Sequence, residues 1–99
     1  MKIPKSFQLF GTTIDVVFND KKMEKECSLG LSEHFKSKIT LTKTTNKKKL
    51  SDGVVLDSFY HEKVHTILDA MYEHKLSSNE KFVEVFSRLL RQSDETSKF

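Results

Sequence analysis

The chain has 99 residues and a formal net charge of +3 at pH 7, which comes mostly from lysines. This length predicts a single domain, 1–99, and so weak a basic bias is typical of a solvated surface and argues against a nucleic-acid partner. Cys27 is the only cysteine, which excludes an internal disulfide and predicts a reducing cytoplasm. No apolar run is long enough to predict an export signal or a membrane span.

Residues 1–43 alternate between apolar and polar side chains, which predicts a small antiparallel β-sheet of three to four strands. The first two extended segments should form a hairpin around Gly11, and the charged stretch 21–26 fits either a loop or one helical turn. A polar loop at 44–52 follows the sheet. The extended segments lie at 7–10, 13–18, 31–35 and 38–43.

The second half of the chain has apolar residues at helical spacing, which predicts helices at 53–74 and 78–92 and a frayed tail at 93–99. The first helix has an apolar stripe formed by Tyr60, Val64, Ile67, Leu68 and Met71. The second has a predicted buried face formed by Phe82, Val83, Phe86, Leu89 and Leu90. The fold class is therefore predicted to be α+β, a sheet followed by two helices.

The first of these helices contains an HExxH pattern, His61-Glu62-Lys63-Val64-His65. Residues four apart share one face of a helix, so His61 and His65 can bind one metal ion. Glu62 lies beside them, where its carboxylate can take a proton from a water on that metal. At 100° per residue, both histidines fall at the border of the apolar stripe, and Glu62 is expected on the open side of a cleft.

A catalytic zinc site needs a third protein ligand. Glu80, Glu84, His74, His34 and several aspartates are available. Measured from Phe86, Glu80 lies about 120° away, whereas Glu84 lies about 160° away and is expected to point to solvent. Glu80 is therefore preferred, although a carboxylate in the first turn also favours the helix dipole. Two imidazoles and one carboxylate suit zinc better than magnesium or calcium.

The order of these features resembles that of small phage and prophage proteins of the zincin superfamily. The matching segments are 9–12, 29–31, 39–41, 58–68 and 79–83. The resemblance implies a minimal gluzincin-like fold in which His61, His65 and Glu80 bind Zn²⁺ and Glu62 is the general base. Lys63 departs from the pattern, because such motifs generally carry uncharged residues between the glutamate and the second histidine.

Two functions follow from these features. The first is a zinc-dependent metallopeptidase that acts on a peptide or protein substrate, in the host cytoplasm if the chain is phage-encoded. The alternative is a non-catalytic zincin-like protein, with or without zinc, that binds a host or phage protein. For the first function, Tyr60, Tyr72 and His34 are the candidates to stabilise the oxyanion.

Overall fold

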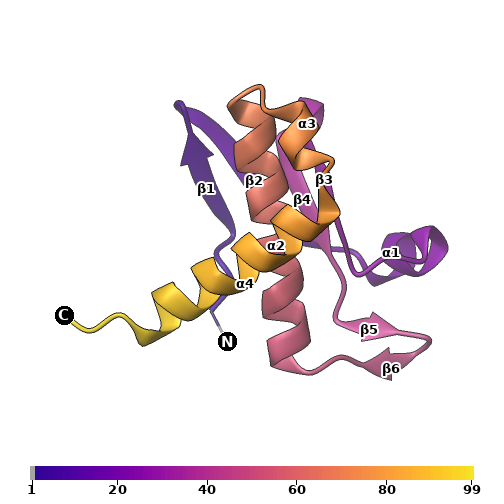
Figure 1. Cartoon of the computed structure of the whole chain (residues 1–99). Coiled ribbons are helices and arrows are strands. Elements are labelled where there is room, and N and C mark those ends of the chain that lie inside the picture. Colours follow the sequence, from indigo (N-terminus) through magenta and orange to yellow (C-terminus); the bar gives the residue numbers. More distant parts are fainter. Residues whose placement is uncertain (1) are drawn as a thin grey trace.

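The computed structural model describes residues 2–99, which form a mixed β-sheet with helices packed against it (Figure 1). The predicted α+β class is confirmed. The strands are β1 Ser6–Leu9, β2 Thr12–Phe18, β3 Gly30–Glu33, β4 Lys38–Leu41, β5 Thr44–Thr45 and β6 Lys48–Lys49. The helices are α1 Asp20–Glu26, η1 His34–Lys36, α2 Asp52–Ala70, α3 His74–Ser77 and α4 Glu80–Thr96. Within this range, no helix combines the length and apolar character that a membrane span requires.

The main sheet has the strand order β1-β2-β4-β3 and is not wholly antiparallel, so that part of the prediction is wrong. β2 and β4 run parallel, with Asp15 opposite Lys38 and Phe18 opposite Leu41. The connection through α1 lets β3 take the outer edge, and β4 then returns between β3 and β2. Alternation of side chains fixes which face of a strand is buried but not which strand is its neighbour.

Two short elements lie in segments that the sequence left open or assigned to a loop. Residues 20–26 form helix α1, whose Met23 is fully buried and whose Asn19 side chain accepts the Lys22 N–H. β5 and β6 form a hairpin inside the predicted loop, with Asn46 at φ 48° and Lys47 at φ 65°. Two left-handed residues at a hairpin turn usually include glycine, which is absent here, so the turn was not predicted.

Helix α2 ends at Ala70, rather than near 74, because the chain reverses there. Tyr72 has a left-handed backbone, φ 61°, and the Glu73 N–H donates to the Leu68 carbonyl, which closes the end of the helix. The short helix α3 then leads the chain back. This reversal brings the start of α4 against the face of α2 (Figure 1).

Helix α4 continues to Thr96, so most of the predicted frayed tail is helical. Two contacts hold this last part. Tyr60 on α2 donates its hydroxyl to Asp94 at 2.8 Å, and Arg91 pairs with Glu95 one turn away at 2.8 Å. The polar composition of residues 93–99 predicted a frayed tail, because it gave no sign of the hydrogen bond between Asp94 and Tyr60 on α2.

The hydrophobic core has two parts, one beneath the sheet and one between α2 and α4. The first contains Ile14, Val16, Ile39, Leu41 and Phe59, and the second contains Val64, Leu68 and Val83. Phe86 and Leu89 were predicted to be buried, but 45% and 58% of their surfaces are exposed. One face of α2 packs on the sheet, and its opposite face contacts α4 through Val64 and Leu68. This contact covers the side of α4 that carries Val83 and leaves Phe86 and Leu89 partly exposed.

Candidate metal centre

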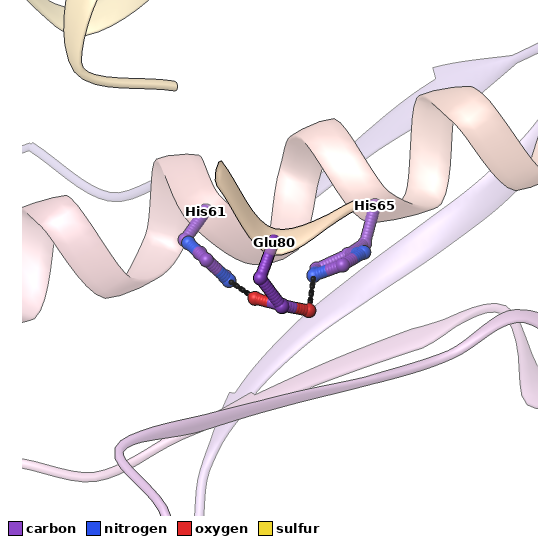
Figure 2. A group of neighbouring side chains, drawn as sticks. All are labelled: His61, His65 and Glu80. Atoms are coloured by element: carbon purple, nitrogen blue, oxygen red, sulfur yellow. Dashed lines mark ion pairs between the residues drawn. The ribbon is translucent and has the colours of Figure 1, made fainter. Parts of the chain in front are cut away.

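His61 and His65 lie one turn apart on α2, and the first residue of α4, Glu80, reaches between them (Figure 2). Glu80 Oε2 is 3.3 Å from His61 Nε2, and Glu80 Oε1 is 3.3 Å from His65 Nε2. The Asn79 side chain caps α4 by accepting the Phe82 N–H, which fixes where the helix begins. The three side chains named from the sequence are therefore brought together.

The donor set and its spacing fit a zinc ion. One ligand atom from each of His61, His65 and Glu80 can be chosen so that all lie within 4.8 Å of one another. Two ligands bound at about 2.0 to 2.1 Å to one tetrahedral zinc are separated by about 3.3 Å. Each imidazole Nε2 lies at this distance from one Glu80 oxygen, His61 from Oε2 and His65 from Oε1, so the carboxylate faces both rings. Two neutral imidazoles and one carboxylate also leave a fourth position for a water or substrate.

The second ring nitrogen of each histidine also has a partner. His61 Nδ1 lies 3.2 Å from Glu84 Oε2, and His65 Nδ1 lies 3.0 Å from the Ser77 hydroxyl. Partners at Nδ1 hold each ring so that Nε2 faces Glu80, and such contacts commonly orient metal-binding histidines. Ser77 is buried at the end of α3, and its position beside His65 depends on the chain reversal between α2 and α4.

The prediction that Glu84 points to solvent is wrong. The helical angle of Glu84 was taken relative to Phe86, whereas the residues that α4 buries are Val83 and Ser87. From that side of the helix, Glu80 and Glu84 both turn toward α2. The spacing of these two glutamates, four residues apart, is the sequence signal that could have placed them together.

The other candidate histidines lie elsewhere. His74 is exposed and pairs with Asp69 at 3.2 Å. His34 lines a separate cavity of about 300 Å³ together with Tyr72. Tyr60 donates its hydroxyl to Asp94, and burial together with that contact raises the Tyr60 pKa to about 12. Within residues 2–99, the side chains of Tyr60, Tyr72 and His34 form no hydrogen bond or ion pair with His61, His65 or Glu80.

Glu62 lies against the edge strand β3. A methyl group placed on Gly30 would come within 2.9 Å of Glu62 Cγ and 3.1 Å of Oε2, so the absence of a side chain at Gly30 makes room for this glutamate. Burial raises the pKa of Glu62 and the charge of Glu80 raises it further, while His61 and Ser32 oppose the shift. A carboxylate with a raised pKa is a better proton acceptor near neutral pH.

Burial also acts on His65. Desolvation, together with the nearby His61, lowers the pKa of His65 below its usual 6.5. The imidazole is therefore neutral at pH 7, which is the form that binds metal ions.

Lys63, the residue that departs from the usual motif, lies away from the candidate metal ligands. Its ammonium group is 5.2 Å from the centre of the Phe7 ring, 5.7 Å from that of Phe59 and 5.9 Å from that of Tyr60. A lysine on this side of α2 adds cation–π contacts with aromatic rings of β1 and α2. Its charge therefore does not enter the group formed by His61, His65 and Glu80.

A groove of about 350 Å³ extends from His61 and Glu62 between α2, α4 and the start of β3.

Comparisons of the chain with protein-family models, with curated proteins and with solved structures find no match. Membership of a zincin family therefore stays a prediction from the motif.

Proposed function

We propose that the chain is a zinc metallopeptidase in which His61, His65 and Glu80 hold the metal and Glu62 is the general base. The observation that carries the proposal is the convergence of His61, His65 and Glu80 from α2 and α4, with one ligand atom of each within 4.8 Å of the others. The groove beside Glu62 supports it, because a hydrolase needs access for its substrate.

Each residue of the site would have a distinct role in the reaction. When bound, zinc would polarise the scissile carbonyl and lower the pKa of a water, so that this water gives up a proton as its oxygen attacks the carbonyl carbon. A Glu62 carboxylate oxygen would accept the proton of that water and pass it to the nitrogen of the leaving amine. Glu84 and Ser77 would hold the imidazoles of His61 and His65 through their Nδ1 atoms.

Metal analysis of protein purified without a metal-chelating tag tests the first half of the proposal. We expect one zinc per chain, lost in His61→Ala, His65→Ala and Glu80→Gln but retained in His74→Ala, which changes a histidine outside the group. Absence of zinc in the unmodified chain after loading at neutral pH would refute the proposal. Cleavage of a peptide library tests the second half, and Glu62→Gln should abolish cleavage while keeping the metal.

A second candidate function keeps the fold without catalysis. Val85, Phe86 and Leu89 form an exposed apolar strip on α4, on the helix that also carries Glu80 and Glu84. Such a strip suits contact with a host or phage protein. Zinc binding without turnover of any peptide, together with a specific partner lost in Phe86→Ser, would support this function over the first.

A further inference from the structure

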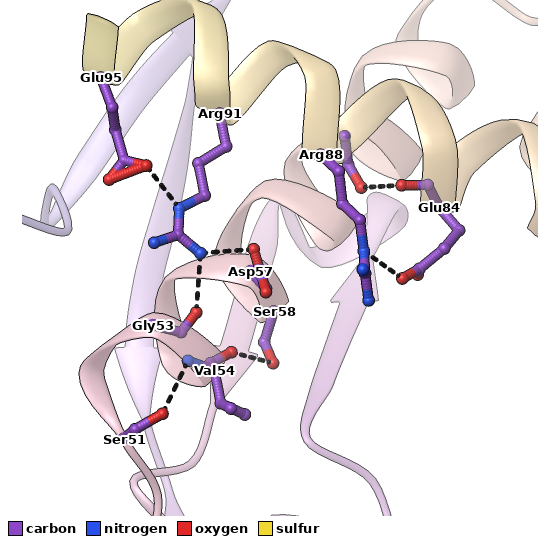
Figure 3. A network of polar contacts seen from close by, with 10 residues as sticks. Ser51, Gly53, Val54, Asp57, Ser58, Glu84, Arg88, Arg91 and Glu95 are labelled. Atoms are coloured by element: carbon purple, nitrogen blue, oxygen red, sulfur yellow. Dashed lines mark hydrogen bonds and ion pairs between the residues drawn. The ribbon is translucent and has the colours of Figure 1, made fainter.

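The groove beside the candidate metal centre continues past the ligands along α2 and α4. Besides His61, Glu62 and Glu84, its lining includes the apolar Leu29 and Val54 and the polar or charged Asp57, Ser58, Ser87 and Arg88. Figure 3 shows Glu84 and Arg88 projecting together from α4, with Arg91 further along the helix directed at Gly53 and Asp57. The groove is large enough for one or two amino-acid side chains.

Two of the three acidic residues along this groove, Asp57 and Glu84, already have basic partners, and the third, Glu62, lies against Gly30. Asp57 accepts from Arg91 at 2.6 Å, and Glu84 contacts both Arg88, at 2.7 Å, and His61, at 3.2 Å. Arg88 differs from them. It uses only Nε for Glu84, and its two terminal nitrogens have no hydrogen bond or ion pair in the described part of the chain. The guanidinium therefore offers two donors to a group that enters the groove.

A second positively charged feature is the β5–β6 hairpin with its lysines. Ser28 and Leu29 line the groove and also a neighbouring cavity, which residues 44–46 of this hairpin line as well. Residues 43–51 contain four lysines and no acidic residue. Lys47, Lys48 and Lys49 have no ion-pair partner within residues 2–99. Figure 1 shows this hairpin projecting beside α1, on the side where α2 begins. Ser28 and Leu29 therefore connect the groove that Arg88 lines with the cavity beside this hairpin, whose lining also includes Glu24.

We propose that the groove binds an acidic peptide segment, in which one carboxylate pairs with Arg88 and further acidic residues face the β5–β6 hairpin. This specificity rests on the proposed metallopeptidase function, because it names the substrate class of the same site. Carboxylates match the planar pair of donors that Arg88 leaves open. A nucleic-acid strand fits the groove less well, because no Phe, Tyr or Trp lines it for a base to stack on, and its lining includes the acidic Asp57, Glu62 and Glu84.

Binding measurements with matched peptides test this proposal. The protein would be the zinc-loaded chain carrying Glu62→Gln, so that cleavage does not consume the probe. Three fluorescent peptides of one length and scaffold would carry Glu, Gln or Lys at the same three positions. Arg88→Gln removes the proposed contact, and Lys81→Gln is the matched control, because it removes one positive charge from the same helix outside the groove.

We expect the Glu peptide to bind about tenfold more tightly than the Gln peptide, as one charge-assisted pair would give. Arg88→Gln should remove most of that difference, while Lys81→Gln should keep it. Replacing Lys47, Lys48 and Lys49 by Gln should weaken the Glu peptide mainly at low salt. Equal binding of the three peptides, preference for the Lys peptide, or no effect of Arg88→Gln would overturn the proposal.

Two further results separate this inference from others. A single-stranded oligonucleotide that displaces the Glu peptide and binds more tightly at the same salt would overturn it in favour of nucleic acid. The zinc content of each sample is measured in parallel. If no zinc is bound and the preference for Glu persists, the acidic-peptide site stands and the metallopeptidase proposal falls.

Discussion

Gly30→Ala tests the contact between the edge strand β3 and Glu62. The added methyl carbon would lie 2.9 Å from Glu62 Cγ, whereas carbon atoms in contact are about 3.5 to 4.0 Å apart. The Glu62 side chain must therefore move by about 0.6 to 1 Å. A displacement of about 1 Å at a reacting group costs about a hundredfold in rate.

The stability of this variant should change little. An alanine in place of glycine gains about 0.4 to 1 kcal/mol by restricting the unfolded chain, and an off-rotamer glutamate loses about 0.5 to 1.5 kcal/mol. We therefore expect the free energy of unfolding in urea to stay within about 1 kcal/mol of that of the parent chain. Gly53→Ala is the control, because its methyl group would meet nothing closer than Arg91 Nη2 at 3.8 Å.

Two assays read out the position of Glu62. Carbon-13 NMR follows the titration of its carboxyl group, whose pKa should fall toward the ordinary value as the side chain leaves its buried place. Peptide cleavage should fall about a hundredfold in Gly30→Ala and stay unchanged in Gly53→Ala. If neither the pKa of Glu62 nor the cleavage rate changes, Gly30 does not determine where this carboxylate lies.

Three further predictions concern the fold. Val83→Ala should lower the free energy of unfolding in urea by about 2 kcal/mol, because Val83 is fully buried. Val85→Ala is the control, and it should change this free energy by no more than about 0.5 kcal/mol, because Val85 is half exposed on the same helix. Equal losses would contradict the burial of the Val83 side of α4. Lys63→Met should cost about 0.5 to 1 kcal/mol through loss of its ring contacts, against no loss in Lys81→Met. The Lys43 N–H and the Thr42 hydroxyl lower the pKa of Asp20 below 3.8, so its ionised form stabilises the fold above that pH, and this stabilisation is lost as the pH falls further. Asp20→Asn should therefore lower the melting temperature at pH 7, with a smaller difference from the parent chain below pH 4, and a constant difference would contradict this assignment.

The closeness of His61 and His65 was predictable, because residues four apart on one helix share a face. Glu80 reaches them only because the reversal at Tyr72 and the short helix α3 bring the start of α4 back onto α2. Glu84 was misplaced because the prediction took the most apolar side of α4, around Phe86, as the buried one. Ser77 gave no signal, since its contact with His65 depends on the short helix α3.

The fold was predictable to the level of its α+β class, whereas helix η1 between the strands was not predicted and α1 was left open as a loop or one helical turn. The parallel neighbours β2 and β4 could not be inferred, because side-chain alternation carries no information on strand order. The end of α2 was also missed. It depends on the left-handed backbone of Tyr72, a conformation that glycine or asparagine usually adopts.

The parallel pairing of β2 with β4 bears on the order in which the site assembles. It joins residues 23 positions apart, such as Asp15 and Lys38, and Glu62 meets Gly30 across 32 positions, whereas His65 and Glu80 are 15 positions apart. Contacts between distant residues form slowly in folding, and local helical contacts form fast. We therefore expect a refolding chain to gather His61, His65 and Glu80 before the sheet closes over Glu62. Zinc capture would then precede catalytic competence during refolding.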